Sequence, residues 1–196
     1  KERRRGWEGL GSMLGIILLV LFPMVCNGHT WQCQFVFGRW VYNLRSSPSL
    51  SSPPYFAPDA DNHEGGYTFR LCDPVLQTDV GVTCETSLSN MSVCQRSSPN
   101  FSYVAGTGPP AVSQLAPPGT GLVLEALEGD YCSLTNSNRK TLIRVLCPTL
   151  GRPNGTMVGR EADTCVYEID VHLDMGCGFH IGSPPPPPPH AFAQTS

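Results

Sequence analysis

Charge is scarce in this chain of 196 residues. Only 15% of the residues are charged, and 13 Lys and Arg stand against 16 Asp and Glu. Five of the 13 positive residues fall within the first 40 positions, so no basic face emerges over the rest of the chain. Proteins that hold nucleic acid need clustered positive charge to neutralise phosphates. The sequence therefore predicts no nucleic-acid partner.

The signatures of common enzyme classes are also missing. There is no G-x-S-x-G, no H-E-x-x-H and no phosphate loop, because Gly106-Thr107-Gly108 is followed by two prolines where a helix would have to begin. Glu161 and Asp163 are two carboxylates at strand spacing, which could divide the acid and base roles of a glycosidase. One functional and one solvated carboxylate explain the pair more simply. We expect no enzymatic activity.

Helical periodicity is absent too, since no window longer than ten residues keeps it after residue 30. Glycine (20) and proline (19) are abundant instead, which favours many turns. Strand-like segments occur at 33–42, 67–71, 122–127, 141–146 and 165–171, and the stretches 46–62 and 106–119 are expected to be loops. The sequence predicts an all-β domain, a sandwich or a flattened barrel.

The first 28 residues have the pattern of a signal peptide. Four of the first five residues are positive, and the apolar run 13–25 is too short to span about 30 Å of hydrocarbon. An uncleaved anchor is the alternative. We expect one domain at 29–177 and, because of six consecutive prolines, a disordered Pro-rich tail at 178–196. No apolar run follows, so the chain as given shows no C-terminal membrane anchor.

Cysteine usage indicates the same compartment. One of the nine cysteines, Cys26, lies in the predicted signal, and an even number remains, which predicts disulfides. No Cys-x-x-Cys occurs, so a zinc cluster is not expected. Acceptor sequons predict glycosylation at Asn90, Asn100 and Asn154. We expect a protein of the secretory-pathway lumen (endoplasmic reticulum, Golgi, endosome or lysosome) or a secreted one.

Four polar residues stand at short offsets from cysteines: Gln95, Arg139, Glu161 and Tyr167. A pyranose presents neighbouring hydroxyls that both donate and accept, so an amide, a guanidinium, a carboxylate and a phenol suit it. Disulfides beside three of the four would hold them rigid, which reduces the entropy lost on binding. Taken singly, a loop amide, a surface ion pair and a core ring would explain them as well.

Five short segments follow one another in order among the eight cysteines. They are YTFRLC (67–72), VCQ (93–95), GDYC (129–132), RKTLIRVLC (139–147), and a Glu and a Tyr that bracket Cys165. Together they resemble the mannose 6-phosphate receptor homology domain family, over about residues 33–177 with insertions at the two loops.

The resemblance implies a flattened β-barrel of two sheets. It also implies a mannose site in which a Gln, an Arg, a Glu and a Tyr contact the sugar, and on this sequence these are Gln95, Arg139, Glu161 and Tyr167. The family's disulfide order would give the pairs Cys33–Cys72, Cys84–Cys94, Cys132–Cys165 and Cys147–Cys177.

The chain departs from the family just before Cys132. The family's cation-dependent receptor has an Asp, an Asn and a His there, for a divalent metal and the phosphate, whereas this chain has Gly129-Asp130-Tyr131. The Asp is displaced by one residue and a Tyr replaces the His, so Asp130 marks only the vicinity of a phosphate or metal site. We expect no cofactor and no metal ligand, with a divalent cation as the less favoured alternative.

The leading hypothesis is a lectin for mannose or mannose 6-phosphate on N-glycans of glycoproteins such as lysosomal hydrolases. It would act in sorting to lysosomes and endosomes or in secretory-pathway quality control. Two alternatives stay open: a protein-interaction module that kept the fold, and a non-catalytic, glycan-presenting subunit of a glycosidase. A soluble lectin and a receptor whose anchor lies beyond the given chain both remain compatible with the sequence.

Overall fold

Strands and two short 3-10 turns make up the regular structure of the part that this computed structural model describes, residues 32–46, 53–61, 64–76, 84, 90–98 and 101–182. The all-β fold class is thereby confirmed. Within these residues no helix has the length and apolarity needed to cross a bilayer. The predicted signal peptide, most of the Pro-rich tail and Asn100 lie outside the described residues.

Buried and half-exposed side chains alternate clearly in β12, in which Tyr167, Ile169 and Val171 are buried while the residues between them are half-exposed. The strands are β1 (Gln34–Phe37), β2 (Trp40–Asn43), β3 (Tyr55–Pro58), β4 (Gly66–Phe69), β5 (Met91–Ser98), β6 (Phe101–Gln114), β7 (Gly121–Leu127), β8 (Tyr131–Cys132), β9 (Ser137–Asn138), β10 (Lys140–Leu146), β11 (Thr156–Asp163), β12 (Val166–His172) and β13 (Phe179–His180). The 3-10 turns are η1 (Leu44–Ser46) and η2 (Asp174–Gly176).

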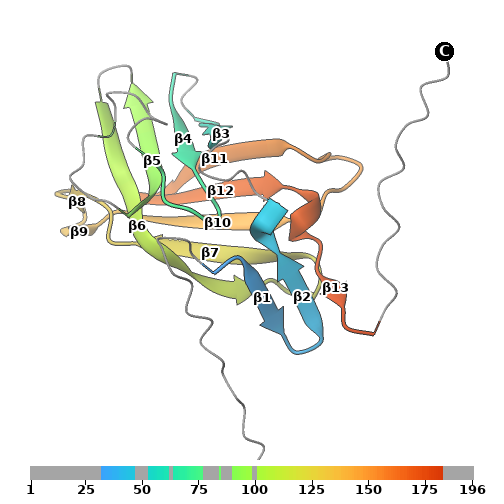
Figure 1. Cartoon of the computed structure of the whole chain (residues 1–196). Helices are drawn as coiled ribbons and strands as arrows, with labels where there is room; N and C mark the ends of the chain where they lie inside the picture. Colours follow the sequence, from blue (N-terminus) through green and yellow to red (C-terminus); the bar gives the residue numbers. More distant parts are fainter. Residues whose placement is uncertain are drawn as a thin grey trace, which may run out of the picture.

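Eight strands form one curved sheet in the order β11-β12-β10-β7-β6-β5-β4-β3 (Figure 1). All neighbours are antiparallel except β10 and β12, which are parallel. The two edges approach each other, because Asp59, just after β3, forms a bridge with Gly159 of β11, and the N–H of Ala60 donates to the Gly159 carbonyl at 2.8 Å. The sheet therefore nearly closes into the flattened barrel that the family resemblance implies.

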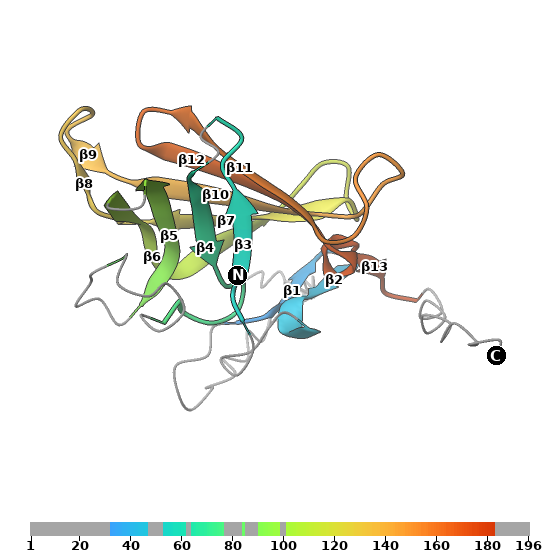
Figure 2. The same cartoon turned by 90° about the horizontal axis from the view of Figure 1, so that it is seen from above.

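A second sheet of three strands, β1-β2-β13, lies at one end of the barrel. The small β8–β9 hairpin lies at the opposite end in both views (Figures 1 and 2). The turn between β11 and β12 lies at the same end as β8–β9, close to where β10 begins (Figure 2). The described chain continues past Cys177, since Phe179 and His180 pair with β2.

Two stretches expected to be loops contain strands. The stretch 46–62 contains β3, and most of 106–119 belongs to β6, so both loop predictions are wrong in part. Prolines lack the N–H that a strand ladder uses and are tolerated at irregular positions. The pairing of β6 with β7 passes from Thr107 directly to Ala111, so Pro109 and Pro110 fall where the register shifts.

The barrel interior is a continuous apolar core of alternate strand residues. Its buried members include Phe69, Leu122, Leu124, Ile143, Val145, Ile169 and Val171, with Tyr67 and Tyr167 toward one end. Tyr42 and Leu44 of the β2–η1 segment add to the same core and join the small sheet to the barrel.

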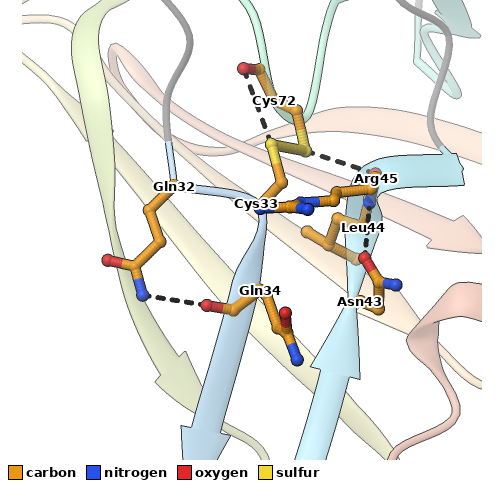
Figure 3. The surroundings of a disulfide bond; sticks show 7 residues. All are labelled: Gln32, Cys33, Gln34, Asn43, Leu44, Arg45 and Cys72. Carbon is orange, nitrogen blue, oxygen red and sulfur yellow. Dashed lines mark hydrogen bonds between the residues drawn. A yellow bond between two sulfur atoms is a disulfide. The ribbon is translucent and has the colours of Figure 1, made fainter. Parts of the chain in front are cut away.

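Four disulfides tie the elements together, and their pairs are those that the resemblance implies: Cys33–Cys72, Cys84–Cys94, Cys132–Cys165 and Cys147–Cys177. The first fastens the small sheet to the barrel. Figure 3 shows the Cys72 Sγ beside the carbonyl oxygen of Leu44, at 3.2 Å, in a region where the N–H of Leu44 donates to the Cys33 carbonyl. Four disulfides indicate an extracytoplasmic or lumenal protein.

Candidate functional site

Three of the four predicted sugar-contacting residues come from adjacent strands at the β8–β9 end of the barrel. Glu161 of β11 lies directly opposite Tyr167 of β12. Arg139 stands immediately before β10, two residues from Thr141, which is the partner of Tyr167 across the parallel pair. Because side chains two residues apart in a strand share a face, Arg139 and Tyr167 are directed toward the barrel interior, whereas Glu161 lies beside Tyr167 with an exposed side chain.

Gln95 approaches from the other side of the barrel. It lies on β5 between Tyr67 of β4 and Tyr103 of β6, which are its direct cross-strand partners, and it is only 5% exposed. Directly opposite residues place their side chains on one face, with Cβ atoms about 4.5–5.5 Å apart. Tyr67, Gln95 and Tyr103 therefore form a row along the inner face of these three strands.

The two groups meet through rings and the guanidinium. The Arg139 Cζ lies 3.9 Å from the centre of the Tyr103 ring, and Arg139 Nη1 donates a hydrogen bond to Tyr167 Oη. The rings of Tyr167 and Tyr67 are 5.7 Å apart between centroids, in a tilted arrangement. These pairings and contacts join five side chains into one cluster, in the order Gln95, Tyr103, Arg139, Tyr167 and Tyr67. Glu161 lies beside Tyr167 at the edge of this cluster.

The sequence did not assign Tyr67 or Tyr103 to this site. Tyr67 was expected only as the apolar face of a strand, within the YTFRLC segment. Tyr103 carried no motif. Only the order of the strands reveals that both are neighbours of Gln95.

Two polar atoms of this cluster are buried without a hydrogen-bond partner among the described residues: Gln95 Oε1 and Arg139 Nε. The first is an acceptor and the second is a donor. Buried polar groups are nearly always paired, and leaving one unpaired costs about 1–3 kcal/mol. A hydroxyl group can donate to such an acceptor and accept from such a donor.

Tyr167 and Tyr67 keep their phenolic protons well beyond neutral pH. Burial raises the pKa of Tyr167, with Glu161 acting in the same direction, and this outweighs the lowering effect of Arg139. Burial also raises the pKa of Tyr67, whose hydroxyl donates to the buried Asp59 carboxylate at 3.3 Å. The phenol of Tyr167 is therefore neutral and can donate as well as accept.

Glu161 differs from its neighbours because its side chain is exposed and already partly engaged. Its Oε1 accepts the N–H of Cys165 at 2.6 Å, and Cys165 has a left-handed backbone with φ 61°. That bond holds the β11–β12 turn, which the Cys132–Cys165 disulfide also fastens to the β8–β9 hairpin. A carboxylate has about four acceptor positions, so this bond leaves capacity for a ligand.

Asp130, the residue predicted to mark a phosphate or metal vicinity, has its carboxylate bonded to the backbone. The Oδ2 of Asp130 accepts the N–H of Val104 at 2.8 Å. Within the described part of the chain, no group of three or more His, Cys, Asp or Glu is placed to share a metal ion.

Two of the predicted glycosylation positions can be placed. Asn90 is exposed in the turn before β5. Asn154 is exposed as well, and its Nδ2 donates to the Asp174 carboxylate at 2.9 Å. Neither lies among the side chains of the site.

No family model matches the chain, and no curated protein does. Solved structures do match. Chicken IGF2R domain 11 aligns with a TM-score of 0.57 at 16% identity, covering 74% of this chain and 91% of that chain. Domain 11 of the echidna mannose 6-phosphate/IGF2R receptor, an NMR structure, aligns with a TM-score of 0.53 at 19% identity, covering 75% of this chain and 96% of that chain.

A third match is the MRH domain of Yos9 complexed with alpha3,alpha6-Man5, with a TM-score of 0.33 at 17% identity and 74% coverage of both chains. The chain therefore has the fold of the mannose 6-phosphate receptor domains, as its ordered motifs indicate. At these identities the likeness concerns the fold, and the ligand has to be argued from the side chains.

Proposed function

We propose that this domain is a lectin without catalytic activity, which binds a mannose-type sugar between Gln95, Arg139, Glu161 and Tyr167. The observation that carries the proposal is the buried, unpartnered pair formed by Gln95 Oε1 and Arg139 Nε. A sugar hydroxyl can donate to the first and accept from the second. Each such bond removes the cost of a buried unpaired group, so binding gains more than a hydrogen bond exchanged with water.

The surrounding groups also suit a neutral, hydroxyl-rich ligand. The Tyr167 phenol stays protonated, and Glu161 supplies acceptors. One cation and one carboxylate leave this group of side chains without a large excess of positive charge. Plain mannose therefore fits these residues at least as well as a phosphorylated sugar does.

The proposed cellular role depends on the lumenal or extracellular location of the domain. A lumenal or extracellular lectin for mannose-type sugars would meet N-glycans of glycoproteins such as lysosomal hydrolases. We propose a role in glycoprotein sorting to endosomes and lysosomes or in quality control, in the lumen of the endoplasmic reticulum, Golgi or endosome. The four disulfides and the fold support this compartment.

A glycan array tests the proposal. The domain, secreted from cells that form disulfides, should bind mannose-terminated N-glycans and lose that binding when Gln95 is replaced with leucine. Gln95→Leu removes the amide but keeps a buried side chain of similar size, so the fold should persist. The control is Gln114→Leu, whose amide donates to the Tyr42 hydroxyl, where the small sheet joins the barrel. A folded domain that binds no glycan would favour the protein-interaction alternative, and co-purification with a glycosidase would favour the subunit alternative.

A further inference from the structure

We propose that Tyr103 and Asp130 form a brace that fixes the Arg139 guanidinium, and that Asp130 serves in it as a hydrogen-bond acceptor rather than as a ligand for metal or phosphate. The proposal deepens the proposed sugar site and rests on it for the effect on affinity. The brace itself is a property of the unliganded domain.

The first part of the brace consists of four hydrogen bonds around Asp130, three between backbone groups and one to the Asp130 carboxylate. On one side, the Asp130 N–H donates to the Val104 carbonyl at 2.7 Å and the Val104 N–H donates to Asp130 Oδ2 at 2.8 Å. On the other side, the Arg139 N–H donates to the Asp130 carbonyl and the Gly129 N–H donates to the Arg139 carbonyl, each at 2.9 Å. Asp130 therefore links β6 directly to Arg139, the residue that precedes β10.

The turn leaves no room for a larger residue beside Asp130. A Cβ added to Gly129 would lie 2.4 Å from the Val104 carbonyl oxygen and 3.0 Å from that of Arg139. Backbone atoms cannot move aside as a flexible side chain can. The spacing between Val104 and Arg139 is thus held closely on both sides of the turn.

The side-chain part of the brace is the Tyr103 ring, which adjoins Val104 in β6. Its centre lies 3.9 Å from the Arg139 Cζ, within cation–π contact. Tyr167 engages the Nη1 edge of the same guanidinium. A ring on the face and a hydroxyl at one edge orient a planar group, so the direction of its unpartnered Nε is set before any ligand arrives.

This arrangement assigns the Asp130 carboxylate a role that depends on its acceptor oxygen. An asparagine could accept the Val104 N–H in the same way, although it carries no charge. A metal or phosphate role, by contrast, would depend on the charge. The two roles therefore separate in a single substitution.

The test measures glycan affinity for four variants of the domain, with and without a chelator. Tyr103→Phe and Asp130→Asn should bind a mannose-terminated glycan within about threefold of the unaltered domain, because ring and acceptor remain. Tyr103→Leu and Asp130→Ala should bind roughly 5- to 30-fold more weakly, the range of a lost cation–π contact or hydrogen bond. The chelator should change none of these values.

A second readout needs no glycan and keeps this proposal separate from the proposed function. In the NMR spectrum of the free domain, the aromatic ring should shift the Hε resonance of Arg139 away from that of an unstacked arginine. Tyr103→Phe should keep this shift, and Tyr103→Leu should abolish it. Should Asp130→Ala fail to fold, Asp130→Asn still decides the role of the carboxylate.

Two results would overturn the proposal. One is an Arg139 resonance that does not change in Tyr103→Leu. The other is a loss of binding in Asp130→Asn matched by chelator treatment of the unaltered domain, which would make Asp130 a metal ligand. If no glycan binds but the Arg139 resonance responds as expected, the brace stands and the proposed sugar ligand does not.

Discussion

Replacing Arg139 with lysine should weaken binding of a mannose-terminated glycan by roughly 30- to 150-fold, although the charge is kept. The guanidinium donates from Nη1 to Tyr167 while a second donor, Nε, is buried and unpartnered. A lysine has one nitrogen on a flexible stem and cannot serve both directions or stack flat on Tyr103. Losing the contact of Nη1 with the Tyr167 hydroxyl and that of Nε with a sugar hydroxyl costs about 2–3 kcal/mol, which corresponds to a 30- to 150-fold loss of affinity.

The strand that follows Arg139, β10, offers the matched control. Arg144 points to the outer face of β10, where its guanidinium pairs with Asp170 at 2.6 Å and with Glu168 at 3.0 Å. Arg144→Lys alters a half-exposed ion pair, which contributes about 0–1 kcal/mol to stability, and should leave affinity unchanged. Isothermal titration of both variants measures the difference. Equal affinities for Arg139→Lys and the unaltered domain would remove the guanidinium from the site.

Replacing Gly159 with alanine should destabilise the domain by about 1–3 kcal/mol and also weaken sugar binding. A Cβ at this position would lie 2.2 and 2.4 Å from two ring atoms of Tyr67, which is fully buried. The ring cannot retreat easily, because its hydroxyl donates to Asp59 and its other neighbour is the Tyr167 ring. Tyr67 would have to shift, and the tyrosine pair at the site would shift with it.

Thermal unfolding followed by circular dichroism measures this effect. For a domain of this size, each kcal/mol lowers the Tm by about 2–4 °C. Gly151→Ala is the control, since Gly151 is exposed in a turn and a Cβ there meets nothing within 4 Å. A Gly159→Ala domain with the Tm and affinity of the Gly151→Ala domain would show that the Tyr67 ring is not held against β11.

Local patterns in the sequence were sufficient for several strands of the fold. The alternation at 67–71 and 165–171 and the short apolar runs at 122–127 and 141–146 correspond to β4, β12, β7 and β10. Alternation identifies the face that a side chain occupies, because it depends only on the strand's own periodicity. β6 was missed because its Pro109 and Pro110 have the composition of a loop, and only the register shift against β7 shows how the sheet accommodates them.

The site could be predicted only in part for a related reason. Gln95, Arg139, Glu161 and Tyr167 were predicted from their offsets to cysteines and from the family resemblance, and the structure brings them to one end of the barrel. Tyr103 is recognised as a neighbour of Gln95 only from the pairing of β5 with β6. Strand order is a property of the whole chain, and no local window contains it.

The most direct test of the sugar site compares two ligands by surface plasmon resonance. Mannose-terminated and mannose 6-phosphate-terminated glycans should be passed over the immobilised domain, with and without a chelator of divalent cations. We expect the mannose-terminated glycan to bind at least as tightly as the phosphorylated one, and neither affinity to change with the chelator. This follows because the donors and acceptors of Gln95, Arg139 and Tyr167 suit hydroxyls, while the Asp130 carboxylate is bonded to Val104. A strong preference for mannose 6-phosphate that the chelator abolishes would contradict the proposed metal-independent mannose site.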